Sequence, residues 1–386
     1  MAIISFGSAN TQDFNDVVEG NNKFAINLYQ IINKENQNKN LLFSPYSIST
    51  AIAMIYAGAK NETETQISKV LNFDSNQKAF HENFQKLIEH QYKNTRSIKL
   101  QTANSFWMQK DLKVMESFVK IEKNNYNSEP KLVDFTNTET TRNEINLWVE
   151  NKTKNKIKEL IQPTDIGKET RLVLVNAIYF YADWQVGFNK KQTYESQFTF
   201  VDKQEKKVPF MHTTFPFNYF SDESIQAVEL PYKDGQASMI IILPKVFNEL
   251  NQFEKLFDFN YYHKIISNFS KDTVVLSLPK FKNSARFQLN KTLSEIGMPL
   301  AFTNNADFSG ITGDKTLHIS QVLHQAVIEV SEEGTEASAA TAVLTKRGML
   351  STTKNFNANQ PFIYIIKDNS TGSILFIGKV NNPLEN

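Results

Sequence analysis

The chain has 386 residues, of which 40% are apolar and 22% are charged, a composition typical of folded globular proteins and not of disordered or fibrous ones. Its 42 basic and 41 acidic residues leave a formal net charge of +1, which removes the general electrostatic attraction to nucleic acids and anionic membranes. The absence of cysteine excludes disulfides, thiolate nucleophiles, cysteine-bound zinc and iron–sulfur clusters.

The N-terminal residues do not have the pattern of an export signal. The apolar stretch from Ala2 to Ile4 has no basic residue before it, whereas a signal peptide has a basic start and an apolar core of roughly 7–15 residues. Apolar runs such as 51–59 are far shorter than the ~18 residues of a membrane-spanning helix. We therefore expect a cytoplasmic protein that does not enter the membrane, with release by a non-classical route as the alternative.

The first third of the chain is predicted to be largely helical. Apolar residues recur with helical spacing over 21–32. Ser44 is a candidate N-cap, Pro45 suits the first helical position, and the apolar helix that they begin is expected to stop near Gly58. Pro163 is expected to end a long polar helix. The remaining predictions in this part are helices over 61–71, 76–92 and 144–161 and a strand over 98–108.

The second half is predicted to be rich in strands. It contains short runs of Val, Ile, Phe and Tyr bounded by Pro, Gly, Asn and Asp. The run over 172–181 is apolar on both faces, which predicts a central strand that is covered on both sides. No linker, repeat or charge block divides the chain, so one α+β domain over 1–386 is expected. Further strands are predicted over 197–200, 217–220, 226–231, 237–244, 274–279 and 362–367.

No motif in the sequence indicates catalysis. The chain lacks Gly-x-Ser-x-Gly, His-Glu-x-x-His, a phosphate-binding loop ending in Lys-Ser/Thr, and Gly-x-Gly-x-x-Gly. None of the six histidines is spaced to share a helix face with another histidine and a carboxylate. A protein that is not an enzyme, with no cofactor and no metal site, is therefore expected.

The most informative stretch is 330–343, where small residues follow one another almost without interruption after Gly334. With the strand period of two, Thr335, Ala337, Ala339 and Thr341 share one face, and all four are small. No proline interrupts the run. A plain loop or a short helix is the alternative, because alanine favours helix. The pattern favours a segment that can enter an existing sheet as an additional strand.

This stretch and other blocks, in the same order along the chain, are similar to the serpins. The resemblance covers nearly the whole chain, and so many ordered matches exclude chance. We identify the chain as a member of the serpins on this resemblance. The matching blocks are Glu-Glu-Gly-Thr-Glu-Ala-Ser-Ala-Ala-Thr-Ala over 332–342, Phe-Ser-Pro-Tyr-Ser-Ile-Ser over 43–49, Leu-Val-Asn-Ala-Ile-Tyr-Phe over 174–180 with Trp184, and the blocks 228–232, 278–281, 306–311, 361–362 and 376–383.

The resemblance implies the serpin fold, with about nine helices around three β-sheets and an exposed reactive-centre loop over about 332–360. It also implies a suicide inhibitor. A protease cuts the loop and forms an acyl-enzyme, and the loop then inserts into the main sheet before deacylation, which deforms the protease. The hinge that inserts is implied to comprise Glu332, Gly334, Thr335, Glu336, Ala337, Ser338, Ala339, Ala340 and Thr341.

Two further sites are implied by the same resemblance. Ser44, Ser47, Asn176 and His324 match the shutter, the region beneath the main sheet where strands must part. Trp184 and Lys280 match the breach at the top of the sheet, where the loop enters. Lys280 is implied to pair there with Glu332; the alternative is that both are unpaired surface charges.

The bond that the protease cuts stays open between two choices. Counting from Glu332 with the usual loop length places the cut after Gly348, which offers a specificity pocket no side chain. A loop one residue shorter gives Arg347–Gly348, which suits a trypsin-like protease, and one residue longer gives Met349–Leu350, which suits a chymotrypsin- or elastase-like one. The expected partner is a serine protease of either or mixed specificity.

The remaining expectations concern other partners, the oligomeric state and alternative functions. Neither nucleic acid nor membrane is expected as a partner, and the protein is expected to be a monomer. One alternative function is that of a non-inhibitory serpin acting as a chaperone, carrier or storage protein. Another is inhibition of an intracellular cysteine protease.

Overall fold

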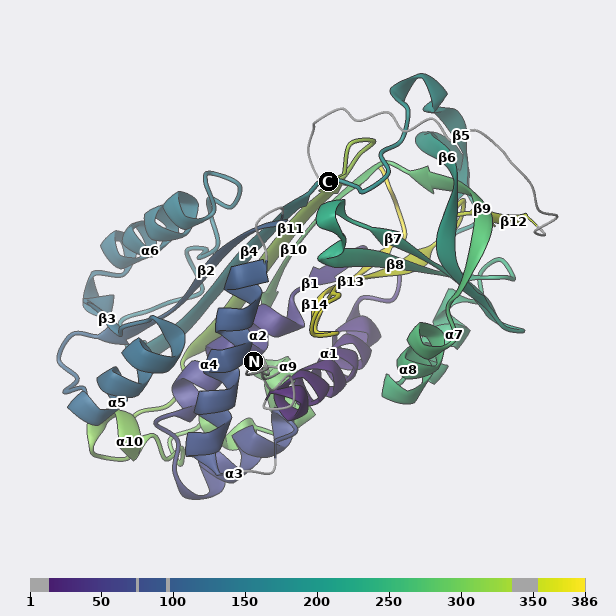
Figure 1. Cartoon of the computed structure of the whole chain (residues 1–386). Coiled ribbons are helices and arrows are strands. Elements are labelled where there is room, and N and C mark those ends of the chain that lie inside the picture. The colour runs from purple at the N-terminus through teal and green to yellow at the C-terminus, as the bar shows by residue number, and fades with distance from the viewer. Residues whose placement is uncertain (1–13, 74–75, 95–97, 335–352, 386) are drawn as a thin grey trace, which may run out of the picture.

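Two β-sheets with helices packed around them make up the fold (Figure 1). The computed structural model describes residues 14–73, 76–94, 98–334 and 353–385. Within these residues no helix is both long enough and apolar enough to cross a membrane.

All four helices that the sequence predicts before residue 95 are present. They are α1 (Asn15–Glu35), α2 (Pro45–Tyr56), α3 (Asn61–Val70) and α4 (Gln77–Asn94). Helix α2 begins as predicted, because the Ser44 hydroxyl accepts a hydrogen bond of 3.2 Å from the Ser47 backbone N–H. The later α-helices are α5 (Glu116–Ile121), α6 (Thr138–Lys152), α7 (Leu250–Leu256), α8 (Phe259–Ser267), α9 (Asn290–Ile296) and α10 (Ser309–Thr312). Short helical turns are η1 (Glu122–Tyr126), η2 (Phe135–Asn137), η3 (Lys190–Gln192), η4 (Lys233–Gly235) and η5 (Pro299–Phe302).

The predicted helix over 144–161 is wrong in its bounds. Helix α6 starts earlier and ends at Lys152, because Lys154 and Asn155 adopt positive φ angles of 49° and 64° and turn the chain away. Ile157, Leu160 and Ile161 repeat with helical spacing, yet they are buried in the loop that follows α6. The helical spacing of these apolar residues therefore belongs to an irregular segment that covers the sheet, and not to a helix.

The smaller sheet has five strands in the order β10-β11-β4-β2-β3. Its strands are β2 (Ile98–Gln109), β3 (Lys131–Val133), β4 (Leu172–Ala182), β10 (Phe281–Gln288) and β11 (Gln321–Val330). Strand β4 lies at the centre and is buried along almost its whole length, as predicted. It pairs antiparallel with β2 and parallel with β11.

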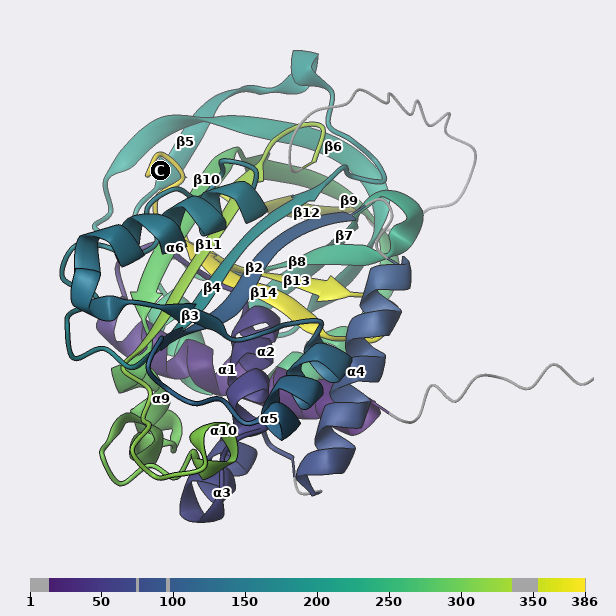
Figure 2. The ribbon, with the colours of Figure 1, turned by 90° about the vertical axis from the view of Figure 1, so that its left-hand side faces the viewer.

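The two faces of this sheet are covered by different helices. Figure 2 shows α6 over one face and α2 behind the other. Side chains at odd positions of β4, such as Val173 and Val175, pack in a cluster with Ile145 and Val149 of α6. Side chains at even positions, such as Leu174, join the larger core on the α2 side. The alternation follows from the period of two along a strand.

The larger sheet has nine strands. Eight of them run in the order β1-β14-β13-β8-β7-β6-β9-β12, and β5 pairs with β6. Strand β12 lies within the range 332–360 assigned to the predicted loop and pairs in parallel with β9. The strands are β1 (Leu41–Phe43), β5 (Tyr194–Thr199), β6 (Glu205–Ser221), β7 (Ile225–Pro231), β8 (Ala237–Pro244), β9 (Ser270–Pro279), β12 (Lys354–Asn357), β13 (Phe362–Asp368) and β14 (Ile374–Val380).

The count of elements differs from the one that the resemblance implies. The described residues form ten α-helices and two hydrogen-bonded sheets instead of about nine helices and three sheets. The reason for the sheet count is the long strand β6. Its first part pairs with β5 and β9 and its last residues pair with β7, so β6 joins two groups of strands into one continuous sheet.

Candidate functional site

Three polar side chains cross the five-stranded sheet at the same level. His324 of β11 is in register with Asn176 of β4, and Asn176 is in register with Asn104 of β2. All three occupy positions that face α2, because their neighbours Val175 and Leu323 face α6. The row therefore links three adjacent strands on the core side of the sheet.

Helix α2 supplies the other half of this polar cluster. The Asn176 Nδ2 atom lies 2.7 Å from each of three acceptors, namely Ser47 O, Ser47 Oγ and Asn104 Oδ1. The Ser47 hydroxyl also donates to Asn104 Oδ1 over 2.9 Å. The Ser44 hydroxyl donates to Leu375 O of β14 over 2.7 Å, which connects the cluster to the larger sheet. Buried polar groups require such partners, so the cluster favours one arrangement of the strands.

The neighbours of His324 determine which ring nitrogen carries its proton. Its Nε2 atom lies 3.1 Å from the Ser44 backbone N–H and must accept that hydrogen bond. Its Nδ1 atom faces Asn176 Oδ1 and therefore donates. The side chain is completely buried, and this burial lowers the pKa of His324 from 6.5 to about 3. A second proton would place two donors against each other at Nε2, so the folded chain keeps His324 neutral.

The first prediction is that the protein loses stability in mild acid through His324. Below pH 6.5 His324 becomes protonated in the unfolded chain, whereas in the folded chain it stays neutral down to about pH 3. In that window the free energy of unfolding should fall by roughly 1.4 kcal/mol per pH unit because of this group. Urea unfolding of the wild type and of His324→Gln at pH 7, 5.5 and 4.5 measures the difference. Equal pH slopes for the two proteins would contradict the assignment.

At one end of the sheet, Trp184 holds the chain that follows β11. Its ring stacks on Tyr232 with centroids 4.5 Å apart, and its Nε1 donates to Ser331 O over 3.0 Å. The Trp184 backbone N–H donates to Glu333 O over 3.0 Å, and the Phe188 N–H donates to Glu332 O over 2.8 Å. The backbone over 331–333 is therefore held by the segment that follows β4.

Two consecutive carboxylates at this end are held by lysines from different elements. Glu332 is 5% exposed, and its Oε2 lies 2.8 Å from Lys280 Nζ while its Oε1 accepts from the Thr193 hydroxyl over 2.9 Å. Burial by itself raises the pKa of Glu332, but the hydrogen bonds from Lys280 and Thr193 outweigh it and hold the pKa below its usual value. The neighbouring Glu333 pairs with Lys190.

The second prediction compares these two lysines. Lys280→Ala should lower the free energy of unfolding by about 1–2 kcal/mol, because it leaves the buried Glu332 carboxylate with one fewer charged donor. Lys190→Ala serves as the matched control and should lower the free energy of unfolding less than Lys280→Ala does, because Lys190 is 66% exposed. Urea unfolding followed by tryptophan fluorescence measures both. The reverse order of the two effects would contradict the geometry.

Gly334 is the last residue of the described range 98–334. No other residue type fits its place. Its φ angle is +136°, and a Cβ atom there would lie 2.3 Å from Ala182 O and 2.5 Å from Asp183 Cα. Gly334 forms β-bridges with Asp183 and Ser331. The chain thus turns at the end of β11 directly against the end of β4.

The structure brings all the predicted site residues that it describes into two groups. Ser44, Ser47, Asn176 and His324 form one cluster, and Trp184, Lys280, Glu332 and Gly334 lie at one end of the same sheet. The other predicted hinge and bond residues lie outside the described residues. These are Thr335, Glu336, Ala337, Ser338, Ala339, Ala340 and Thr341, and Arg347, Gly348, Met349 and Leu350.

Sequence reasoning did not assign Asn104, Tyr232, Lys190 or Thr193 to these sites. Asn104 lies inside a predicted strand, and a single asparagine at a core-facing position was the available signal. Tyr232 lies in the matching block 228–232 but had no role assigned, and Lys190 gave no signal, because only the fold brings them to Trp184 and Glu333. Among the residues that the structure describes, no three His, Asp or Glu side chains gather in a way that would hold a metal ion.

Comparison with known proteins gives consistent matches. A family model described as Serpin (serine protease inhibitor) matches residues 19–383. The chain is 40% identical to an uncharacterized serpin-like protein of Methanosarcina acetivorans, over 95% of this chain and 86% of that protein. It is 39% identical to a leukocyte elastase inhibitor of Xenopus laevis, over 93% of this chain and 97% of that protein. The structure of human thyroxine-binding globulin superposes with a TM-score of 0.88 at 33% identity, over 97% of this chain and 100% of the other.

These matches confirm the α+β fold class and the serpin fold that the sequence blocks imply. Serine protease inhibition is the activity that the family description names. The similarity extends along almost the whole chain and agrees in sequence and in structure. The chain therefore belongs to the serpin family.

Proposed function

We propose that this protein inhibits a serine protease by acting as its suicide substrate. The observation that carries the proposal is the parallel pairing of β4 and β11, with Gly334 at the end of both strands. A segment that follows β11 directly and folds back between these two parallel strands would run antiparallel to each of them. The chain leaving β11 at Gly334 only has to reverse direction to take that place.

Insertion would exchange one ladder for two. The seven residue pairs between β4 and β11, from Val173 with Gln321 to Tyr179 with Val327, would open. Two antiparallel ladders would replace them, and antiparallel pairing is slightly more stable per residue than parallel pairing. The folded state before insertion is therefore held above its minimum, and insertion releases free energy.

The polar cluster and the clamp at the sheet end would have to yield during this step. The hydrogen bond between His324 and Asn176 spans the two strands that part. Trp184 and Lys280 hold the residues just before the loop through Ser331 and Glu332. These contacts would keep the sheet closed until the protease cuts the loop, and they are the proposed shutter and breach.

The chemistry of trapping needs no catalytic group of this chain. The serine hydroxyl of the protease attacks the carbonyl carbon of the cut bond, an ester to the protease forms, and the peptide bond breaks to release a new amino terminus. The loop segment attached to the ester then inserts and carries the protease with it. Small inward side chains at Thr335, Ala337, Ala339 and Thr341 suit this insertion, because they need no large pocket.

Incubation with trypsin and with chymotrypsin tests the proposal. We expect a complex of chain and protease that survives boiling in detergent. Mass spectrometry of the released C-terminal fragment should show a new N-terminus at Gly348 for a trypsin-like target or at Leu350 for a chymotrypsin-like one. Cleavage of the loop by both enzymes without any stable complex would contradict inhibition.

The same gel separates two alternative functions. The similarity to thyroxine-binding globulin favours a carrier without inhibitory action, which would be cut but would form no complex. The small-residue hinge argues against that alternative. Complexes with papain or a caspase, but with neither serine protease, would instead indicate an inhibitor of cysteine proteases.

The state in which the protein acts is part of the proposal. We propose one domain over 1–386 and a monomer, which size-exclusion chromatography with light scattering would test. Cytoplasmic location and the exclusion of nucleic acid and membrane partners stay predictions of the sequence.

A further inference from the structure

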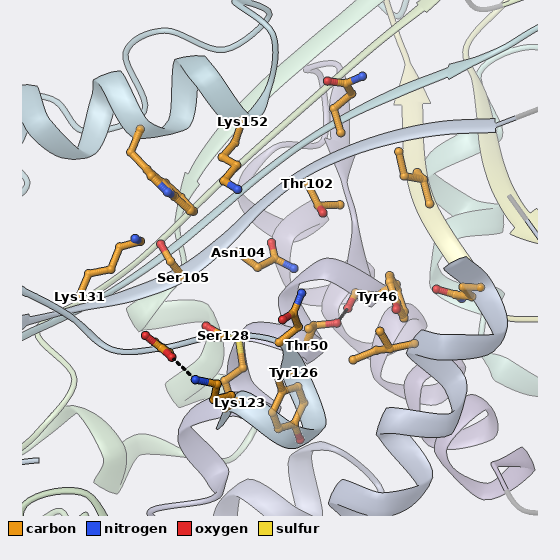
Figure 3. Close-up of a pocket in the computed structure, with 18 of the residues that line it drawn as sticks. Tyr46, Thr50, Thr102, Asn104, Ser105, Lys123, Tyr126, Ser128, Lys131 and Lys152 are labelled. Carbon is orange, nitrogen blue, oxygen red and sulfur yellow. Dashed lines mark hydrogen bonds and ion pairs between the residues drawn. The ribbon is translucent and has the colours of Figure 1, made fainter. Parts of the chain in front are cut away.

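A cavity of about 660 Å³ lies beside β2, between α2, α4, η1, β3 and the end of α6 (Figure 3). This volume is within the range of ~300–1,000 Å³ that is usual for ligand sites. The proposed inhibitory mechanism uses only Asn104 among the residues that line it. The cavity is therefore a candidate for a separate activity of the protein.

The floor of the cavity is an open sheet edge. Strand β2 pairs with β4 along one side, from Ile98 to Met108. On its other side, β3 pairs only with residues 107–109, so within the described chain the edge from Ile98 to Phe106 has no partner strand. Gln101, Thr102, Asn104 and Ser105 of this edge line the cavity. An open edge presents backbone N–H and C=O groups that can pair with an added strand.

The charges around the cavity are strongly unequal. Among the described residues that line the cavity, three lysines and one glutamate are charged. Lys123 is paired with Glu129 over 3.1 Å. Lys131 and Lys152 have no acidic partner among the described residues, and Lys131 lies 5.4 Å from the ring centres of Trp107 and Trp148. Figure 3 shows Lys131 and Lys152 extending toward the cavity from β3 and α6.

The two walls of the cavity differ in chemistry. The α6 side carries Lys131, Lys152 and Trp148, whereas the side formed by α2 and α4 carries apolar residues such as Met54 and Ile88. A strand beside β2 would present alternate side chains to these two sides. The peptide that fits best therefore has acidic residues on the face toward α6 and apolar residues on the face toward α2 and α4.

One polar group in the wall lacks a hydrogen-bond partner in the part of the chain that the structure describes. Gln91 of α4 is 4% exposed and lines the cavity, and its Nε2 atom makes no hydrogen bond with these residues. A buried donor without an acceptor costs free energy. A ligand that brings a carbonyl or carboxylate oxygen to Gln91 would recover this cost.

We propose that this cavity binds an extended peptide of a partner protein, with alternating acidic and apolar residues, as an additional strand on the open edge of β2. The acidic side chains meet Lys131 and Lys152, and the apolar ones meet the wall formed by α2 and α4. The peptide backbone pairs with the open edge of β2 and so continues the strand position that β3 occupies beside residues 107–109. This activity is separate from the trapping of a protease and does not depend on it.

Fluorescence anisotropy with a fluorescein-labelled peptide Gly-Glu-Val-Glu-Val-Glu-Val tests the proposal on the full wild-type chain. We expect saturable binding that weakens about tenfold or more when lysine replaces each glutamate. Only alternate N–H groups of an added strand point toward β2. N-methylation of the three glutamates and N-methylation of the three valines should therefore differ, with one version losing binding and the other keeping it.

Variants of the chain locate the site. The double variant Lys131→Gln/Lys152→Gln should bind the peptide about tenfold more weakly. The double variant Lys168→Gln/Lys271→Gln removes two exposed lysines elsewhere and should bind as the wild type does. Absence of saturable binding to the wild-type chain would overturn the proposal. Equal affinity for both methylated peptides would also overturn it, because an anion site without strand pairing gives that result.

Discussion

Replacing Thr335 by arginine is expected to convert the proposed suicide inhibitor into a plain substrate of the protease. The substitution lies twelve residues or more before either candidate cut bond, so the protease should still cut the chain. Insertion would place the charged side chain in the interior beneath the sheet, where an unpaired charge is strongly unfavourable. Stable complexes with protease should therefore fall to background on a denaturing gel, while the cleaved chain accumulates at the rate of the wild type.

Ser338→Arg is the matched control for this variant. With the strand period of two, residue 338 lies on the opposite face of the inserted segment from 335. The same side chain would then point to the outer face and should leave complex formation close to that of the wild type. If Thr335→Arg still traps protease, or if both variants fail equally, the assignment of the inward face is wrong.

Replacing Asn176 by alanine should have the largest effect on stability. The change removes the acceptor of the buried His324 Nδ1–H and the donor that lies 2.7 Å from Ser47 O, Ser47 Oγ and Asn104 Oδ1. Each buried polar group that is left unpaired costs about 1–3 kcal/mol. We expect the free energy of unfolding to fall by about 3 kcal/mol or more, measured by urea unfolding.

On warming without any protease, Asn176→Ala should also lose inhibitory activity faster than the wild type does. The cluster that spans β2, β4 and β11 would no longer favour the closed sheet, so opening would not need a protease. Residual inhibition after incubation at moderate temperature measures this loss. Asn355→Ala, which removes an exposed asparagine on β12, is the control and should change neither quantity. Equal behaviour of the two variants would contradict the proposed role of the cluster.

Local chemistry explains the parts of the fold that could be predicted. Ser44 and Pro45 identify the start of α2, because an N-cap side chain and a proline at the first helical position act within one turn. The apolar run over 172–181 predicts β4 as a central strand, because burial on both faces leaves no polar face. These signals depend on neighbours a few residues away in the chain.

Other elements could not be predicted from signals of this local kind. Ile157, Leu160 and Ile161 have helical spacing, but they are buried against the sheet from an irregular segment that tertiary packing holds in place. The strand predictions also omitted β10 and β11, as well as β1, β3, β12 and β14. On β10 the polar residue Asn283 interrupts the apolar face that Phe281 and Phe287 would otherwise mark. The pairing partners of β10 and β11 come from distant parts of the chain.

The candidate site shows the same division. The sequence by itself determined the family and singled out Ser44, Ser47, Asn176 and His324, because these are patterns of residue type and spacing. The small-residue face of the hinge stays a prediction of the sequence. Only the tertiary structure decided that Asn104 joins them, that Lys190 holds Glu333, and that a cavity borders the open edge of β2. The physical reason is distance along the chain. Ser44 and His324 are 280 residues apart in sequence yet share a hydrogen bond, and such contacts depend on how whole strands pair.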